Sequence, residues 1–168
     1  MKTLLLLRHA KSSWEKSDLA DFDRPLNSRG LAAAPLAGNI IYDRHLQLDL
    51  ILSSPAKRAK QTAVLVKETG QITVKIQYEE KIYEASPLSL LSILAEQSDK
   101  NESILLVGHN PGLEGLIKVL TGKTATVQTA TLAKINLKIE NWQGISPNCG
   151  ELEFVARAEE ETKKLSAE

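Results

Sequence analysis

The stretch Leu4-Leu5-Leu6-Leu7-Arg8-His9-Ala10 is where the analysis of the fold begins. Four consecutive leucines are too few for a stable helix and are typical of a strand buried on both faces. The run ends in a cation and an imidazole, which are costly to bury unless an anion lies nearby. In open α/β sheets, ligands bind at the carboxyl ends of parallel strands. We therefore expect Arg8 and His9 to line an anion site with a nucleophilic or proton-carrying histidine, although this segment alone equally allows a solvated loop.

The composition is that of a globular protein with no overall charge. The chain has 168 residues, of which 42% are hydrophobic, and Lys+Arg and Asp+Glu both number 21. A formal net charge of zero argues against general nucleic-acid or membrane-surface binding, so a phosphate site needs a local concentration of positive charge. Cys149 is the one cysteine, which fits a reducing compartment, and no stretch approaches the length of a membrane span. We expect a soluble, cytoplasmic protein with a single domain over residues 1–158 and a charged tail over 159–168.

The remaining pattern alternates between strands and helices. Strands are predicted at residues 48–52, 72–76, 103–107, 132–139 and 151–156, and the last two could form a hairpin or lie apart. A first helix is predicted at 30–45, with a kink or a late start at Pro35. A second extends from its N-cap at Ser54 to residue 68, and a third begins after Ser86. A fourth extends from Pro111 to a C-cap at Gly122. This alternation predicts an α/β fold, a three-layer α/β/α sandwich with a mainly parallel central sheet.

Basic residues at three separate places in the sequence should meet at one edge of this sheet. Right-handed crossovers put the carboxyl ends of all parallel strands on the same side, which brings together Arg8, His9, Arg58 and His109. Arg58 would lie in the first turn of a helix, where free N–H groups already favour an anion. Taken singly, Arg58 could be a solvated helix residue and His109 a structural histidine. Two arginines, two histidines and a helix N-terminus together indicate phosphate.

Four motifs in this order resemble the histidine phosphatase superfamily, and they extend from residue 4 to residue 112. They are Leu-Arg-His-Ala (7–10), Ser-Ser-Pro-x-x-Arg-Ala-x-Gln-Thr (53–62), Tyr-Glu-Ala (83–85) and Val-Gly-His-Asn-Pro-Gly (107–112). The segment Asp23-Arg24-Pro25-Leu26-Asn27-x-x-Gly30 is further similar to the small phosphohistidine phosphatase (SixA-type) branch. Ala10 stands where the family usually has glycine. The resemblance implies a phosphoglycerate mutase-like fold and metal-independent chemistry that needs no cofactor.

The resemblance also implies a catalytic mechanism. Neutral His9 attacks phosphorus and becomes a phosphohistidine, Arg8, Arg58 and His109 hold the phosphoryl oxygens, and water then cleaves the phosphoenzyme. Glu84 stands at the position of the family's general acid; the alternative is a polar residue before a capped helix.

The polar stretch between residues 11 and 27 is expected to be a functional or mobile loop. Trp14 and Arg24 are its candidate substrate-contacting residues. Its three aspartates are expected to form a solvated cluster with a salt bridge to Arg24 rather than to act as catalytic acids: Asp18, Asp21 and Asp23.

The expected substrate is a phosphorylated protein. Eighteen residues separate Glu84 from Ser103, where larger mutase-type relatives place extra helices that enclose small substrates. A shallow, open pocket should follow, able to admit phosphohistidine on a folded protein. Two alternatives stay open: a broad phosphatase for small phosphate esters, and a catalytically poor module that binds phosphorylated ligands. The oligomeric state is not indicated.

Overall fold

The four leucines lie in β1 (Lys2–Arg8), an interior strand of a six-stranded sheet with the order β3-β2-β4-β1-β5-β6. The computed structural model describes residues 1–16 and 18–161. The other strands are β2 (Leu50–Ser53), β3 (Ile76–Tyr78), β4 (Ser103–Gly108), β5 (Thr131–Leu137) and β6 (Gly150–Arg157). Strands β1 to β4 are mutually parallel, and β5 runs antiparallel to both of its neighbours, β1 and β6. The last two strands therefore pair with each other, and the predicted mainly parallel sheet is confirmed.

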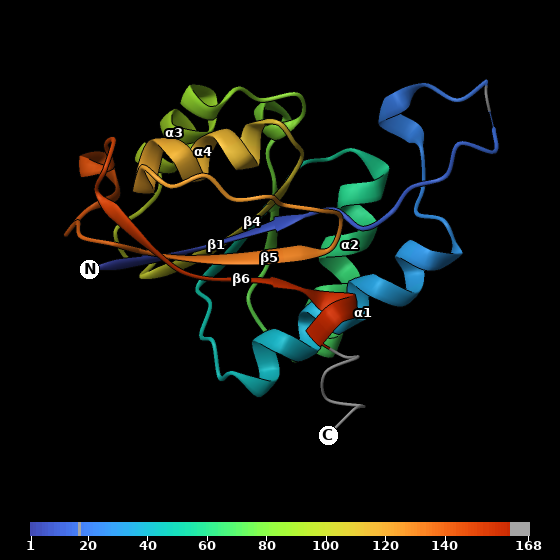
Figure 1. Cartoon of the computed structure of the whole chain (residues 1–168), viewed down its shortest axis with the longest axis horizontal. Helices are drawn as coiled ribbons and strands as arrows, with labels where there is room; N and C mark the ends of the chain where they lie inside the picture. The colour runs from blue at the N-terminus through green and yellow to red at the C-terminus, as the bar shows by residue number, and fades with distance from the viewer. Residues whose placement is uncertain (17, 162–168) are drawn as a thin grey trace.

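Helices cover both faces of the sheet, which confirms the three-layer sandwich (Figure 1). Helices α1 (Ser28–Asp43) and α2 (Lys57–Thr69) pack on one face, in a core with Leu5 and Leu7. Helices α3 (Pro87–Ala95) and α4 (Gly112–Thr121) pack on the other, in a core with Leu4 and Leu6. Burial on both faces explains why β1 is a continuous apolar run rather than an alternating one.

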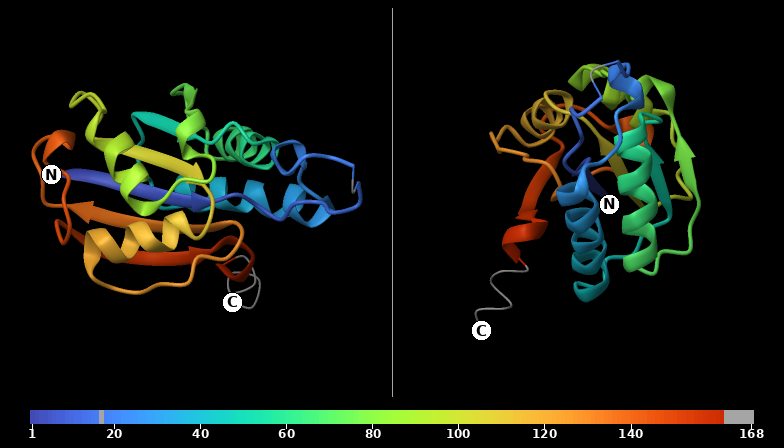
Figure 2. Two further views of the ribbon diagram at one scale, coloured as in Figure 1. Left: turned by 90° about the horizontal axis from the view of Figure 1, so that it is seen from above. Right: turned by 90° about the vertical axis from the view of Figure 1, so that its right-hand side faces the viewer.

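The loop between β1 and α1 is anchored at its two ends, and it projects beyond the carboxyl end of β1 (Figure 2). Asn27 donates its backbone N–H to the carbonyl of Lys11 at 3.0 Å, and Ser13 donates to Pro25 at 2.8 Å. Asn27 Oδ1 also accepts from the N–H of Gly30 at 2.8 Å and caps α1. A Cβ on Gly30 would lie 2.1 Å from the carbonyl oxygen of Lys11, so this close approach requires glycine.

Several predicted element boundaries were wrong. Helix α1 begins at Ser28, and Pro35 lies inside it without delaying its start. Helix α2 begins at Lys57 after Ala56, so Ser54 is not its N-cap; the Ser54 hydroxyl accepts from the N–H of Ala56 at 3.2 Å and lies 2.8 Å from a histidine instead. Arg58 stays in the first turn of the helix. The N-cap at Ser86 and the C-cap at Gly122, with φ of +74°, are as predicted.

The strand predicted at 72–76 was also wrong. The paired segment is Ile76–Tyr78, which lies beside β2 at the edge of the sheet. The apolar side chains of Ile72 and Val74 pack against the core under α1 and α2, so their alternation reflects that packing and not a strand ladder.

The structure adds two observations on earlier expectations. Within residues 1–16 and 18–161, no helix combines the length and apolar character needed to span a membrane. In the expected tail, Glu159 pairs with Arg29 of α1 at 3.0 Å, and Glu161 pairs with Arg44, the C-cap residue of α1, at 3.3 Å. The rest of the tail, 162–168, lies outside the described residues.

Candidate active site

His9 is the first residue after β1 and is held with a defined tautomer. Its backbone N–H donates to the carbonyl of Gly108 at 3.1 Å, and its side-chain Nδ1 lies 2.7 Å from the carbonyl oxygen of Ala10. A carbonyl oxygen can only accept, so we assign the ring proton to Nδ1 and the free lone pair to Nε2. Nε2 faces Arg58, whose Nε lies 3.4 Å away and donates to it.

The surroundings of His9 keep its imidazole neutral. The side chain is 7% exposed. Burial is the largest cause that lowers the pKa of His9 to about 3, and the nearby His109, Arg58 and Arg8 contribute to the same shift. The hydrogen bond to Ala10 opposes this shift in pKa but does not offset it. At neutral pH, Nε2 is therefore unprotonated and able to attack an electrophile.

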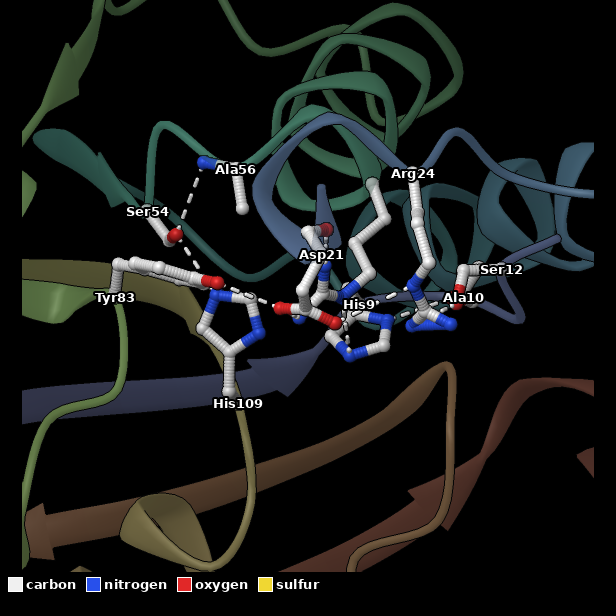
Figure 3. Close-up of polar contacts among 10 residues, drawn as sticks. His9, Ala10, Ser12, Asp21, Arg24, Ser54, Ala56, Tyr83 and His109 are labelled. Carbon is white, nitrogen blue, oxygen red and sulfur yellow. Dashed lines mark hydrogen bonds and ion pairs between the residues drawn. The ribbon is translucent and has the colours of Figure 1, made fainter. Parts of the chain in front are cut away.

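His109 follows β4 and lies beside His9. The two ring centroids are 5.1 Å apart, and His109 Nε2 lies 2.8 Å from the hydroxyl oxygen of Ser54 (Figure 3). Burial, together with the positive charge of Arg58, lowers the pKa of His109 to about 4. Nδ1 of His109 is buried and has no hydrogen-bond partner among the described residues.

Three arginines converge on the two histidines. Arg58 is 6% exposed and Arg24, from the loop before α1, is 7% exposed. Arg8 donates from Nη1 to the carbonyl of Val127 at 3.2 Å, and its Nε is buried without a described partner, as is Nη1 of Arg24. Arg8, Arg24, Arg58 and both histidines line one pocket of about 480 Å³. Buried cationic donors without partners are costly, so this pocket has the character of an anion site.

Asp21 lies in the pocket, whereas its sequence predicted a residue of a solvated cluster. The predicted salt bridge to Arg24 is present, with Nε and Oδ1 separated by 3.3 Å. Asp21 is not part of a purely solvated cluster, however, because its Oδ2 also pairs with Arg58 Nη2 at 3.0 Å and accepts from the Tyr83 hydroxyl at 2.6 Å. The bond from Tyr83 and the two arginines lower the pKa of the Asp21 carboxyl and hold it ionised.

Glu84 is not brought into this pocket. Its side chain is exposed and lines a separate depression with Lys81, Ser89 and Glu96. Its backbone has a positive φ of +57°, which turns the chain so that Tyr83, and not Glu84, faces His109, with ring centroids 5.6 Å apart. The general-acid role of Glu84 stays a prediction, and the geometry does not support it.

Trp14 lies at the rim of the pocket. The guanidinium carbon of Arg24 is 3.4 Å from the centroid of the Trp14 ring, while the Trp14 side chain is 76% exposed. Arg24 Nη2 donates to the hydroxyl of Ser12 at 2.9 Å. The stacking covers one face of the indole and leaves the rest accessible to a bound molecule.

Two polar residues of α2 join it to the segments around His9. Thr62 Oγ1 accepts from the N–H of Ala10 at 3.0 Å and donates to the carbonyl of Arg58 at 2.7 Å. Gln61 Oε1 accepts from the N–H of Leu26 at 2.8 Å. Arg58 and His9 are thus positioned by one shared hydrogen-bond network. In residues 1–16 and 18–161, no group of three or more His, Cys, Asp or Glu side chains is arranged to hold a metal ion.

Comparison with known proteins agrees with this geometry. The model of the histidine phosphatase superfamily (branch 1) matches residues 4–87, which include Arg8, His9 and Arg58. The chain belongs to this superfamily. An uncharacterized protein of Mycobacterium tuberculosis is 32% identical over an alignment of 157 positions, which covers 87% of this chain and 96% of the relative. The uncharacterized phosphatase PhoE of Bacillus subtilis is 24% identical over an alignment of 180 positions, which covers 85% of this chain and 92% of PhoE.

Solved structures show the same fold. A protein of Agrobacterium tumefaciens, provisionally assigned as the phosphohistidine phosphatase SixA, is 30% identical with a TM-score of 0.79, over 92% of this chain and 97% of its own. The protein histidine phosphatase SixA complexed with tungstate has a TM-score of 0.81 at 19% identity, over 94% of this chain and 98% of its own. The expected family and fold are therefore confirmed.

Proposed function

We propose that this protein removes the phosphoryl group from phosphohistidine on a protein through a covalent phosphohistidine at His9. Nε2 of neutral His9 attacks phosphorus, and the bond between phosphorus and the nitrogen of the substrate imidazole breaks. Arg8, Arg58 and His109 stabilise the charge on the phosphoryl oxygens during this transfer. Water then attacks the phosphoenzyme, releases phosphate and regenerates His9.

The proposal depends mainly on the protonation state of the Asp21 carboxyl group, which contacts Arg58 and Arg24 in the pocket. Asp21 is held ionised by Tyr83, Arg58 and Arg24, and a carboxylate of lowered pKa is a poor proton donor. The exposed Glu15 also lines the pocket but has no described contact with the histidines or the arginines. An alkyl phosphate ester needs a proton on its leaving oxygen, whereas an imidazole can leave once it is protonated from solvent. The site therefore favours phosphohistidine.

The exposed side chains near the rim of the pocket fit a substrate carried on a protein. Trp14, Leu19 and Phe22 expose apolar surface on the loop that borders the catalytic groups. Exposed aromatic side chains beside a charged site are typical of protein-binding surfaces. The similarity to the Agrobacterium tumefaciens protein supports the same substrate class.

Paired turnover measurements test the proposal. A protein phosphorylated on histidine and a set of alkyl and aryl phosphate esters are compared under matched single-turnover conditions. We expect a higher kcat/KM for phosphohistidine and an acid-labile phosphoenzyme that is absent in His9→Ala. Faster turnover of alkyl esters would favour the small-molecule phosphatase, stoichiometric binding without turnover would favour the binding module, and a label on His109 would refute the assignment of the nucleophile.

A further inference from the structure

Arg58 is held by one residue of the neighbouring loop, Asp21, which lines the same pocket. Asp21 accepts from Arg58 twice, at its backbone oxygen from Nη1 at 2.7 Å and at Oδ2 from Nη2 at 3.0 Å. The remaining nitrogen, Nε, lies 3.4 Å from His9 Nε2. Asp21 therefore contacts both terminal nitrogens of the guanidinium and does not contact Nε.

The geometry of a guanidinium gives this arrangement a consequence for phosphate binding. Arginine has five N–H donors in a rigid plane, and Nε–H runs parallel to one N–H of Nη2 along one edge. Asp21 occupies the other edge, between Nη1 and Nη2. The edge formed by Nε and Nη2 includes the N–H that donates to the attacking nitrogen of His9, and there it can bind two phosphoryl oxygens at once.

We propose that Asp21 is a positioning residue, which holds Arg58 by one edge of its guanidinium so that the other edge is presented to the phosphoryl group transferred to His9. This rests on the proposed phosphoryl transfer at His9 and assigns Asp21 a role that it performs through Arg58.

Asp21 is fixed from a second side by Tyr83, which strengthens the case for a positioning role. The Tyr83 hydroxyl donates to Asp21 Oδ2 at 2.6 Å, and its ring makes edge contacts with Phe22 and His109, at centroid distances of 5.2 and 5.6 Å. Figure 3 shows the Asp21 carboxylate between Tyr83 and Arg24. The chain Tyr83–Asp21–Arg58 thus joins the loop before α1, the segment before α3 and α2 around His9.

Burial and charge explain what Asp21 prevents. Arg58 is 6% exposed, so without the Asp21 carboxylate its Nη2 would lose a buried acceptor or the guanidinium would move toward another one, whereas Nη1 would keep the backbone oxygen of residue 21. Asp21 compensates one of three positive charges in the pocket, those of Arg8, Arg24 and Arg58. A surplus of positive charge is left for a phosphate dianion.

A double-mutant cycle on Asp21 and Arg58 tests the proposal, with p-nitrophenyl phosphate hydrolysis and vanadate affinity as readouts. In Asp21→Ala we expect kcat to fall about 10²-fold, the cost of misplacing a catalytic group by about 1 Å, with a smaller change in KM. We expect the vanadate Kd to rise by a similar factor. Asp21→Asn keeps an oxygen acceptor and should recover most of both losses. The double variant Asp21→Ala/Arg58→Ala should be no worse than Arg58→Ala, because Asp21 acts through Arg58.

Asp23→Ala is the matched control, since Asp21 and Asp23 belong to one short 3-10 helix (Asp21–Asp23) and the Asp23 side chain has no described contact with Arg58. Wild-type values in Asp21→Ala, equal losses in Asp23→Ala, or additive losses in the double variant would each overturn the proposal. Circular dichroism checks that every variant is folded. The probes are an ester and vanadate, so the double-mutant cycle tests the role of Asp21 even if the protein does not hydrolyse phosphohistidine. Failure of the proposed substrate can therefore be distinguished from failure of the positioning role.

Discussion

Acidification from pH 7 to pH 5 should destabilise this protein through His9, whose imidazole is buried and neutral. The pKa of His9 is about 3 in the folded protein, and it returns to about 6.5 when the chain unfolds. Below pH 6.5 the unfolded chain therefore takes up a proton that the folded protein does not, so the free energy of unfolding falls as the pH falls. The loss continues until the pH reaches the folded value near 3.

The size of this effect follows from the two pKa values. One unit of pKa difference corresponds to about 1.4 kcal/mol, and integration between pH 7 and pH 5 gives a loss of about 2 kcal/mol for His9. This is a large share of the ~5–15 kcal/mol by which domains are usually stable. His109, with a pKa of about 4, acts in the same direction over the same range.

Urea unfolding of wild type and His9→Asn at the two pH values isolates this contribution. The asparagine amide can donate to the Ala10 carbonyl in place of Nδ1–H, and the variant keeps every other titrating group. We expect wild type to lose about 2 kcal/mol more than the variant between pH 7 and pH 5. Equal losses, or a His9 resonance titrating near pH 6.5 in the folded protein, would refute the buried neutral imidazole. The same imidazole predicts an acid limb of kcat/KM well below pH 6.5.

Two further predictions concern residues at the edge of the site. Glu84→Gln should change the single-turnover rate with phosphohistidine less than about threefold; a loss of about 10²–10⁴ with alkyl esters would instead place Glu84 at the leaving group. Trp14→Ala should raise KM for a phosphohistidine protein by about tenfold, the loss of about 1.4 kcal/mol of contact energy, and leave p-nitrophenyl phosphate kinetics unchanged. Equal effects of Trp14→Ala on both substrates would contradict a role in binding protein.

The part of the site that could be predicted from sequence is the part built on strand ends. Leu4 to Leu7 specify a strand buried on both faces, and the parallel topology then brings Arg8, His9, Arg58 and His109 to one pocket. This inference needs only the period of the apolar residues and the handedness of crossovers.

The incorrect predictions concern residues whose positions depend on contacts between segments far apart in the sequence. Ser54 has the residue type of an N-cap, but its hydroxyl is 2.8 Å from His109, whose position the local sequence does not specify. Asp21 was indistinguishable from Asp18 and Asp23 in sequence, and its partners Arg58 and Tyr83 lie 37 and 62 residues away. The direction of the Glu84 side chain follows from a positive φ. Glycine or asparagine would have predicted this backbone conformation, but glutamate does not.

The pairing of β1 with β4 has a consequence for how this site can diversify. Arg8 lies opposite Gly108 in the parallel ladder, so His9 and His109 are the next residues of two hydrogen-bonded strands. Their spacing is a property of the sheet and does not depend on the loops around it. Exchanges around the exposed Trp14 can therefore alter which molecules are admitted, while the backbone positions of His9 and His109 keep their separation. For protein engineering, the exposed residues around Trp14 are the ones to exchange, whereas Asp21 and the strand register are to be kept.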